Sequence, residues 1–223
     1  YGPNIGDFVG AARSYDRVAD VLATLDHLGV QSSQVTLARA NLRSRRADIA
    51  HQASQLDVAR RLFQEAIAEF EALPEARLNE IDVVVEYTAV LDHYADLLGR
   101  EGGGSLNEVA AARDQQAKAR RIREAALQLH PDDARLRFGR YQSELRDGEY
   151  WLGQGDMAQA EAVLSKALAT VTALSEQSPD DVFYRYEQAL VQSRLVPVRD
   201  ALGQLDASIV AALQALATTE ALL

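Results

Sequence analysis

Residues 155–167 read Gly-Asp-Met-Ala-Gln-Ala-Glu-Ala-Val-Leu-Ser-Lys-Ala, and this stretch decides the fold. It places small residues at Ala160 and Ala167 and a bulky one at Leu164 on one face of a helix, which a neighbouring helix can approach closely. Equivalent small residues recur every 48 residues, with one interval of 53: Ala11, Ala59, Ala112, Ala160 and Ser208. Self-similarity of this period is typical of stacked helical hairpins, each of which buries its apolar face on the next.

The composition supports an all-α protein that has neither disulfides nor metal sites with cysteine ligands. The chain has 223 residues, of which 48% are hydrophobic, with 13 Gly, 5 Pro and no Cys. Absence of cysteine excludes disulfides and thiolate metal sites. The formal net charge of -10 disfavours nucleic-acid binding, which needs a positive field. No run of about 18 apolar residues predicts a membrane span, and no signal peptide is visible.

The pattern of apolar residues and helix-breaking residues predicts about nine helices in one domain over residues 1–223. A 48-residue unit leaves room for two helices of about 20 residues each. The interval of 53 is explained by five extra residues in the loop 100–107, and Pro197 is expected to kink or shorten its helix. The first helix, capped by Asp7, has the features of a second hairpin helix. We therefore expect an excerpt of a longer protein that starts mid-repeat. The expected helices cover about 7–28, 34–53, 56–73, 79–99, 107–129, 133–153, 156–178, a helix that begins near 181 and contains Pro197, and 205–222.

The repeats resemble tetratricopeptide repeats, most closely in one hairpin. The residues that carry the resemblance are Gly148, Trp151, Gly155, Asp156, Ala160, Leu164 and Ala167. The resemblance implies an α-solenoid of elongated, about 48-residue hairpins that binds a peptide or protein partner and has no catalytic role. Glu144 occupies the position where the family has its leading Trp, so the match is partial.

A narrower resemblance covers residues 1–15. The segment Tyr1–Asp7, followed by Gly10-Ala11 and Ser14-Tyr15, looks like the repeats in the C-terminal region of bacterial eukaryotic-type serine/threonine protein kinases. It implies a docking or sensing module of a signalling protein, either cytoplasmic or, behind a membrane helix, periplasmic. None of the kinase's own catalytic motifs is present in the chain.

No residue pattern indicates catalysis or a cofactor. The segment Gly102–Gly104 lacks the Gly-Lys-Ser/Thr ending and the preceding strand of a phosphate-binding loop. Asp48-x-x-His51 places two metal-ligand types one helical turn apart, but a bundle metal site needs two such pairs and further carboxylates. We therefore predict no cofactor and no metal. A helical-bundle enzyme or metal carrier is the alternative from a different class.

The acidic residue after the small residue of each first hairpin helix is the main candidate for partner binding. In tetratricopeptide geometry this position faces the concave groove, which would favour a basic partner. The same acids could instead pair with neighbouring arginines and set the stacking register. The predicted groove residues are Asn41, Ser44, Asp48, His51, Gln52, Asp92, Asp96, Gln142 and Glu149.

Three further expectations concern charge, aromatics and self-association. The basic sets Arg39, Arg43, Arg46 and Arg113, Lys118, Arg120, Arg121, Arg123 are expected to be solvated faces with acids nearby. The aromatics Tyr141, Tyr150, Trp151, Tyr184 and Tyr186 are expected to fill the core, with Trp151 largely buried. An apolar stripe of Phe8, Ala12, Tyr15, Ala19 and Leu22 on the first helix suggests a homodimer, as in the dimerisation element of a repeat-containing transcriptional regulator.

Overall fold

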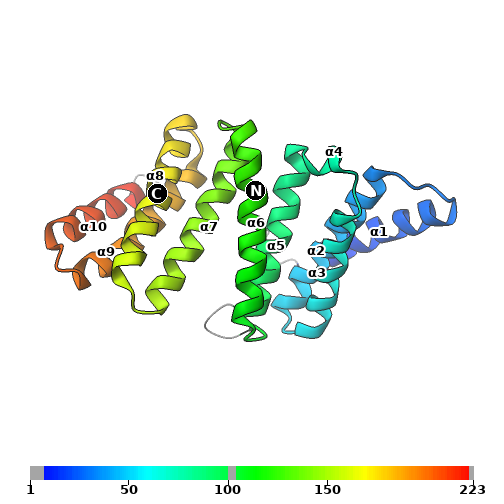
Figure 1. Cartoon of the computed structure of the whole chain (residues 1–223), viewed down its shortest axis with the longest axis horizontal. Coiled ribbons are helices and arrows are strands. Elements are labelled where there is room, and N and C mark those ends of the chain that lie inside the picture. The colour runs from blue at the N-terminus through cyan, green and yellow to red at the C-terminus, as the bar shows by residue number, and fades with distance from the viewer. Residues whose placement is uncertain (1–7, 100–103, 221–223) are drawn as a thin grey trace. The chain divides into compact units, whose positions relative to one another are not determined.

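The computed structural model describes residues 8–99 and 104–220, which are helical and contain no strand (Figure 1). The helices are α1 Phe8–His27, α2 Ser33–Gln52, α3 Leu56–Glu71, α4 Glu75–Leu78, α5 Ile81–Gly99, α6 Val109–Leu129, α7 Ala134–Gly153, α8 Met157–Gln177, α9 Val182–Ala201 and α10 Leu205–Glu220. Consecutive long helices pack in pairs, so the all-α, solenoid-like class predicted from the repeat is confirmed.

The chain divides into two compact units, residues 1–122 and 123–223. In the first unit, α2 packs on both α1 and α3, and α3 packs on α5. Its core combines alanines with Phe63, Phe70 and the leucines of α5, and includes Ala112 and Ala119 from the first half of α6.

The second unit is built from consecutive contacts between α7 and α8, α8 and α9, and α9 and α10. Its core contains Tyr141 of α7, Leu164 and Val171 of α8, and Val191 and Leu195 of α9, all fully buried. Both α8 and α9 therefore pack on the helix that precedes them and on the one that follows, as in a repeat array.

The small residues that define the repeat are buried where two helices meet. Those described are almost inaccessible to solvent, with exposed fractions of 0–7%: Ala59, Ala66, Ala112, Ala119, Ala160, Ala167, Ser208 and Ala215. The small residues of the partner helices, Ala47 and Ala95, are equally buried at 0% and 1%. The small-residue face predicted from the sequence is therefore the face through which hairpins close.

Several helices begin and end at the capping and terminating residues predicted from the sequence. Gly29, Gly155 and Gly203 adopt the left-handed conformation, with φ between 68° and 75°, just after the ends of α1, α7 and α9. Asp133 and Asp156 cap α7 and α8 by accepting hydrogen bonds from backbone N–H groups in the first turn. The cap predicted at Asp7 lies outside the described residues.

Three expectations about the helices differ from the structure. The described residues form ten helices because a four-residue helix, α4, precedes α5, which begins at Ile81 and not at Asn79. The helix that contains Pro197 runs on to Ala201, so Pro197 does not end it. Trp151 is only partly buried: its ring packs on the edge of the second unit's core and meets Tyr150 edge-to-face at 5.2 Å.

The first helix uses its described apolar residues within the chain. Leu22 is buried with Val35 and Leu42 of α2, and Tyr15 and Ala19 pack against the same cluster. The side chains of Phe8 and Ala12 are outside the described set. The part of the stripe that can be described is thus already covered by α2, and little of it is left for a second copy.

Candidate functional site

We use the term inner helices for the first helix of each hairpin: α2 and α5 in the first unit, and α7 and α9 in the second. The second helices, α3, α6, α8 and α10, carry the repeated small residues. The predicted groove residues all lie on three of these inner helices, α2, α5 and α7. The two surfaces are described separately below.

In the first unit, an acid of α2 is tied to a histidine of α5. Asp48 Oδ1 lies 3.0 Å from Nδ1 of His93, and Asp48 Oδ2 lies 4.0 Å from Arg45 one turn earlier on α2. Arg45 also reaches Glu86 of α5 at 3.6 Å. These contacts join two successive hairpins through their inner helices.

The second unit repeats this tie in the same register. Glu149 Oε1 of α7 lies 3.4 Å from Nε of Arg194 of α9. Glu149 is the repeat equivalent of Asp48, and in both units the basic partner follows its acid by 45 residues. We call the pairs Asp48–His93 and Glu149–Arg194 the register ties. Their recurrence shows that a fixed repeat position carries the acid, and a second fixed position carries the basic side chain that meets it.

The predicted groove residues differ in how much surface they offer. Ser44 and Asp92 are buried, at 5% and 3% exposed, and in this conformation have no surface for a partner. Gln52 is exposed, and the remaining six are partly exposed: Asn41, Asp48, His51, Asp96, Gln142 and Glu149. His51 is engaged at the loop after α5, where its Nε2 lies 2.7 Å from the carbonyl oxygen of Gly104.

Aromatic side chains gather on the inner helices of the second unit. Tyr141 is fully buried and donates a hydrogen bond of 2.7 Å to Oε2 of Glu187 on α9. Burial first, and then this hydrogen bond, raise the pKa of Tyr141 well above its usual value. Phe138 lies 5.3 Å from Phe183 and 5.8 Å from Tyr184 between ring centroids. The expectation of core aromatics therefore holds for Tyr141.

Two aromatic rings on α9 are exposed to solvent. Tyr186 is 56% exposed and Phe183 is 45% exposed, although Tyr186 was expected in the core and Phe183 was not singled out. Their spacing of three residues places them on one face of α9, with Leu190 one turn further. That i, i+3, i+7 spacing places the three residues on one helix face in the sequence, but spacing alone does not distinguish an exposed face from a buried one.

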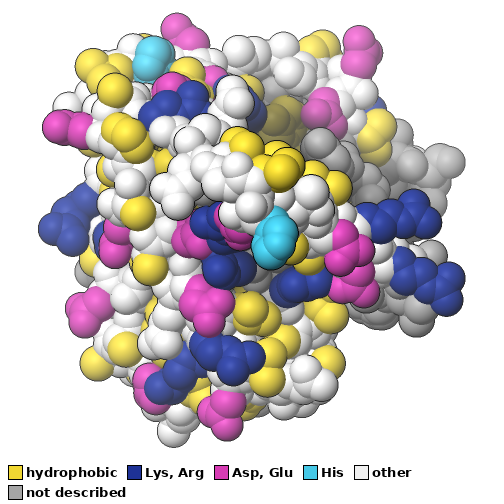
Figure 2. Space-filling view, turned by 90° about the vertical axis from the view of Figure 1, so that its right-hand side faces the viewer, with side chains coloured by type: hydrophobic (Ala, Val, Ile, Leu, Met, Phe, Trp, Pro, Cys, Tyr) yellow, Lys and Arg dark blue, Asp and Glu magenta, His cyan; other side chains and the backbone are white. Residues whose placement is uncertain are grey.

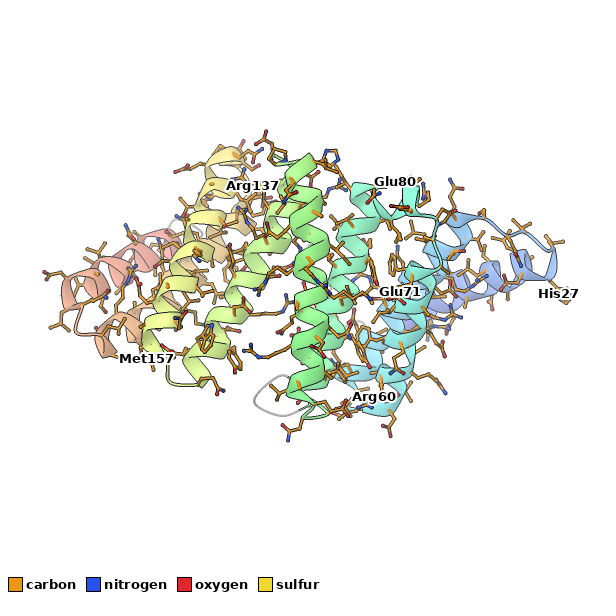
Figure 3. The ribbon with its side chains drawn as sticks, viewed as in Figure 1. His27, Arg60, Glu71, Glu80, Arg137 and Met157 are labelled. Atoms are coloured by element: carbon orange, nitrogen blue, oxygen red, sulfur yellow. The ribbon has the colours of Figure 1, made fainter. Side chains whose placement is uncertain are left out.

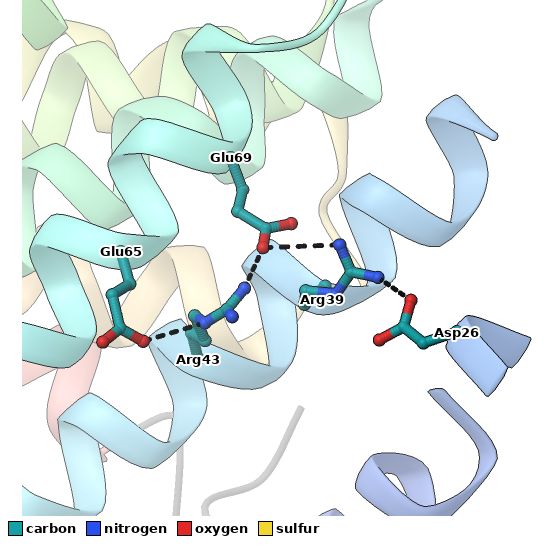
Figure 4. A network of polar contacts seen from close by, with 5 residues as sticks. All are labelled: Asp26, Arg39, Arg43, Glu65 and Glu69. Carbon is teal, nitrogen blue, oxygen red and sulfur yellow. Dashed lines mark hydrogen bonds and ion pairs between the residues drawn. The ribbon is translucent and has the colours of Figure 1, made fainter. Parts of the chain in front are cut away.

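The basic set of α2 is paired with acids of its neighbours: Arg46 with Asp16 of α1 at 2.7 Å, and Arg39 and Arg43 as Figure 4 shows. Arg39 bonds Asp26 of α1, while Arg43 bonds Glu69 and, at 3.0 Å, Glu65 of α3. Arg39 and Arg43 also line an open cleft of about 420 Å³ beside the start of α2. Because three carboxylates surround these two guanidinium groups, the cleft has no spare positive charge for an anion.

The basic set of α6 does not lie entirely in solvent. Lys118 bonds Glu71, labelled in Figure 3, and its ammonium group lies 5.5 Å from the centroid of the Tyr87 ring. Arg123, in contrast, is buried at 2% exposed and donates a hydrogen bond of 2.6 Å to Ser143 of α7. The expectation of a solvated face is therefore wrong for Arg123. The missing side chain of Gly139 makes room for it, because a Cβ there would lie 2.5 Å from Nε of Arg123.

The surface charges are mixed in sign. On the face shown in Figure 2, basic and acidic side chains are interspersed, and neither forms a large continuous field. Over the described ranges, no group of three or more His, Cys, Asp or Glu residues is placed to hold a metal ion. Among the same residues, no helix has the length and apolar character needed to cross a membrane.

Comparison with known proteins adds no family assignment. No protein-family model matches the chain, and no curated protein matches it either.

Proposed function

We propose that the chain is a non-catalytic protein-interaction module, an elongated tetratricopeptide-like array that binds a peptide or protein partner along its inner helices. The observation that carries the proposal is the recurrence of the register ties. They hold partly exposed acids of the inner helices in place before any partner arrives. A surface ordered in advance loses less side-chain entropy on binding than a mobile one, which favours recognition.

The chemistry of the inner helices favours a basic partner. Asp48, Asp96 and Glu149 hold the same position in three hairpins and each retains exposed surface. The chain's net charge of -10 adds a long-range attraction for a cationic partner. On α9, the exposed rings of Phe183 and Tyr186 offer faces on which an Arg or Lys side chain can stack.

A signalling context is supported by the resemblance of residues 1–15 to the repeat region of bacterial eukaryotic-type kinases. In that context the module would dock a substrate or a regulator of the parent protein. The alternative of a helical-bundle enzyme or metal carrier needs a cluster of ligating or titrating side chains. The inner helices instead carry acid–base pairs that join hairpins.

Variants on the two sides of each register tie separate ligand contact from a structural role. Neutralising the acids (Asp48→Asn, Asp96→Asn and Glu149→Asn together) should reduce binding of arrayed Lys- and Arg-containing peptides at least tenfold. Replacing the basic partners (His93→Gln with Arg194→Gln) breaks the same ties but leaves the carboxylates in place. Binding by that variant should fall by less than in the acid variant, because the carboxylates remain but are no longer held in position.

A charge-matched control uses three exposed acids on helices other than α2, α5, α7 and α9. Asp57→Asn, Glu75→Gln and Glu176→Gln change the net charge by the same amount and should leave peptide binding within about twofold. Equal loss of binding in this control would show that only the overall charge matters. Unchanged binding in the acid variant would end the proposal.

A further inference from the structure

The last described helix exposes a continuous aliphatic row that its own unit does not cover. Leu205, Ile209, Leu213 and Leu216 of α10 are 62%, 57%, 60% and 55% exposed, and Val210 beside them is 51% exposed. Spacings of four, four and three residues put the first four on one face of the helix. We call these five residues the α10 stripe. The opposite face, with Ser208, Ala211 and Ala215, is buried against α9.

The 48-residue repeat relates the α10 stripe to a set of residues on α8, one repeat earlier. Forty-eight residues earlier, its members correspond to positions on α8 that are partly buried, apart from the exposed Ala162: Met157, Glu161, Ala162, Ser165 and Leu168. Met157, labelled at the start of α8 in Figure 3, and Leu168 pack against the cluster that includes Val191 and Leu195 of α9. Glu161, the equivalent of Ile209, lies 3.4 Å from Arg199 of α9. The α10 stripe therefore continues a face that binds a helix elsewhere in the same unit.

The residues that link one hairpin to the next are changed here from polar to apolar. Pro197 of α9 occupies the position of the acids Asp48 and Glu149, so α9 has no carboxylate for a register tie. Ile209 replaces Glu161, which removes the partner of an arginine such as Arg199. The α10 stripe therefore carries only apolar side chains where the equivalent face of α8 carries Glu161 and Ser165.

Charge indicates which helix can lie on the stripe. Only Asp206 and Glu220 are charged among the 16 residues of α10, whereas 25% of the whole chain is charged. Two copies of a chain with net charge -10 repel each other over most of their surfaces, and least where charges are absent. An aliphatic, nearly uncharged helix is the best match for the stripe, and α10 itself is such a helix.

We propose that α10 pairs with α10 of a second copy of this chain about a two-fold axis. An isologous contact requires a patch that is complementary to itself, and a row made only of Leu, Ile and Val meets that requirement. The two helices run antiparallel, so that the N-terminal end of one dipole lies near the C-terminal end of the other. This places self-association at the end of the second unit and not at α1.

The oligomeric state of the full chain tests the proposal. Sedimentation or light scattering from about 1 to about 200 µM should show a monomer–dimer equilibrium. Leu213→Lys and Ile209→Lys each place a charge in the contact and should raise the dimer dissociation constant at least tenfold. Val21→Lys, at a 59% exposed position of α1, is the matched control and should leave the constant unchanged. Added salt should not weaken the dimer, because the contact contains no ion pair.

Cross-linking gives an independent measurement, because the chain contains no cysteine of its own. Ala212→Cys puts a single thiol next to the stripe on α10, and Ala169→Cys puts one at an exposed position of α8. Under mild oxidation the first variant should form a disulfide-linked dimer rapidly and the second only slowly. A monomer at all concentrations, equal cross-linking of the two variants, or a dimer broken by Val21→Lys and not by Leu213→Lys would each overturn the proposal.

Discussion

Replacing Gly148 by alanine should destabilise the second unit although alanine is the better helix former. Gly148 lies inside α7, where glycine costs about 1 kcal/mol relative to alanine. An added Cβ would lie 2.5 Å from Cδ2 and 2.6 Å from Cγ of Leu164 on α8. Carbon atoms in ordinary contact are about 3.5–4.0 Å apart, so roughly 1 Å of separation is needed.

Leu164 has no free space into which it could withdraw. It is fully buried in the cluster that contains Ala160, Ala167 and the apolar residues of α9. Forcing extra volume into a packed core costs typically about 1–3 kcal/mol. After subtracting the gain in helix propensity of about 1 kcal/mol, we expect Gly148→Ala to lower the free energy of unfolding by about 1 kcal/mol, with an upper limit of about 2 kcal/mol.

Urea unfolding monitored by tryptophan fluorescence measures this loss directly. The chain's single Trp, Trp151, packs against the core of the second unit, so its emission reports unfolding of that unit. A double-mutant cycle supplies the sharper test. Leu164→Ala removes the obstructing atoms and should itself cost about 2–5 kcal/mol. In that background Gly148→Ala should become neutral or stabilising. If Gly148→Ala stabilises the otherwise unchanged protein by about 1 kcal/mol, close approach of the two helices is not the reason for the glycine.

Three further predictions concern titration and packing. Burial raises the pKa of Glu144, opposed by a 2.9 Å hydrogen bond from Thr170, so the folded state binds the proton more tightly than the unfolded state. Glu144→Gln should therefore unfold at higher urea at pH 7, and its advantage should shrink as the pH falls toward 4.5. The hydrogen bond from Lys118, followed by that from Tyr87, lowers the pKa of Glu71, so its contribution is present above pH 4.5 and is lost as the pH falls below that value. Lys118→Met should flatten the decline in stability below pH 4.5, and an unchanged acid profile would contradict the assignment. Trp151→Ala should cost about 2–3 kcal/mol by circular dichroism, less than a fully buried ring, and a loss above 5 kcal/mol would contradict its partial exposure.

The architecture could be predicted because it depends on a local and repeated signal. Ala160, Leu164 and Ala167 specify a close-packed helix face by themselves, and the 48-residue interval places the same face on the neighbouring hairpins. The short helix α4 could not be predicted in this way. It is a single turn after Pro74 without a repeat equivalent, and its packing on α5 depends on tertiary context.

The candidate surface could be predicted only in part, because sequence spacing indicates a helix face but not its partners. The acids Asp48 and Glu149 were predicted to lie on the inner helices, while the side chains that meet them, His93 and Arg194, were not recognised. The signal was present as a recurring interval of 45 residues between an acid and a base. Burial of Ser44 and Asp92 depends on how closely neighbouring helices approach, which no spacing within one helix reveals.

The register ties also suggest a structural role for the acids on the inner helices, which is to fix how neighbouring hairpins are aligned. An exposed ion pair contributes little stability, about 0–1 kcal/mol. A slip by about two helical turns would bring one small residue of the alanine face to the place of another, so these residues alone specify the register weakly. A tie between two fixed positions penalises such a slip, because the slipped acid meets no cation. A double replacement of His93 and Arg194 should therefore change stability little while broadening the arrangement of neighbouring hairpins. Greater hydrogen exchange in α5 and α9 at unchanged unfolding midpoints would be the result expected from this role.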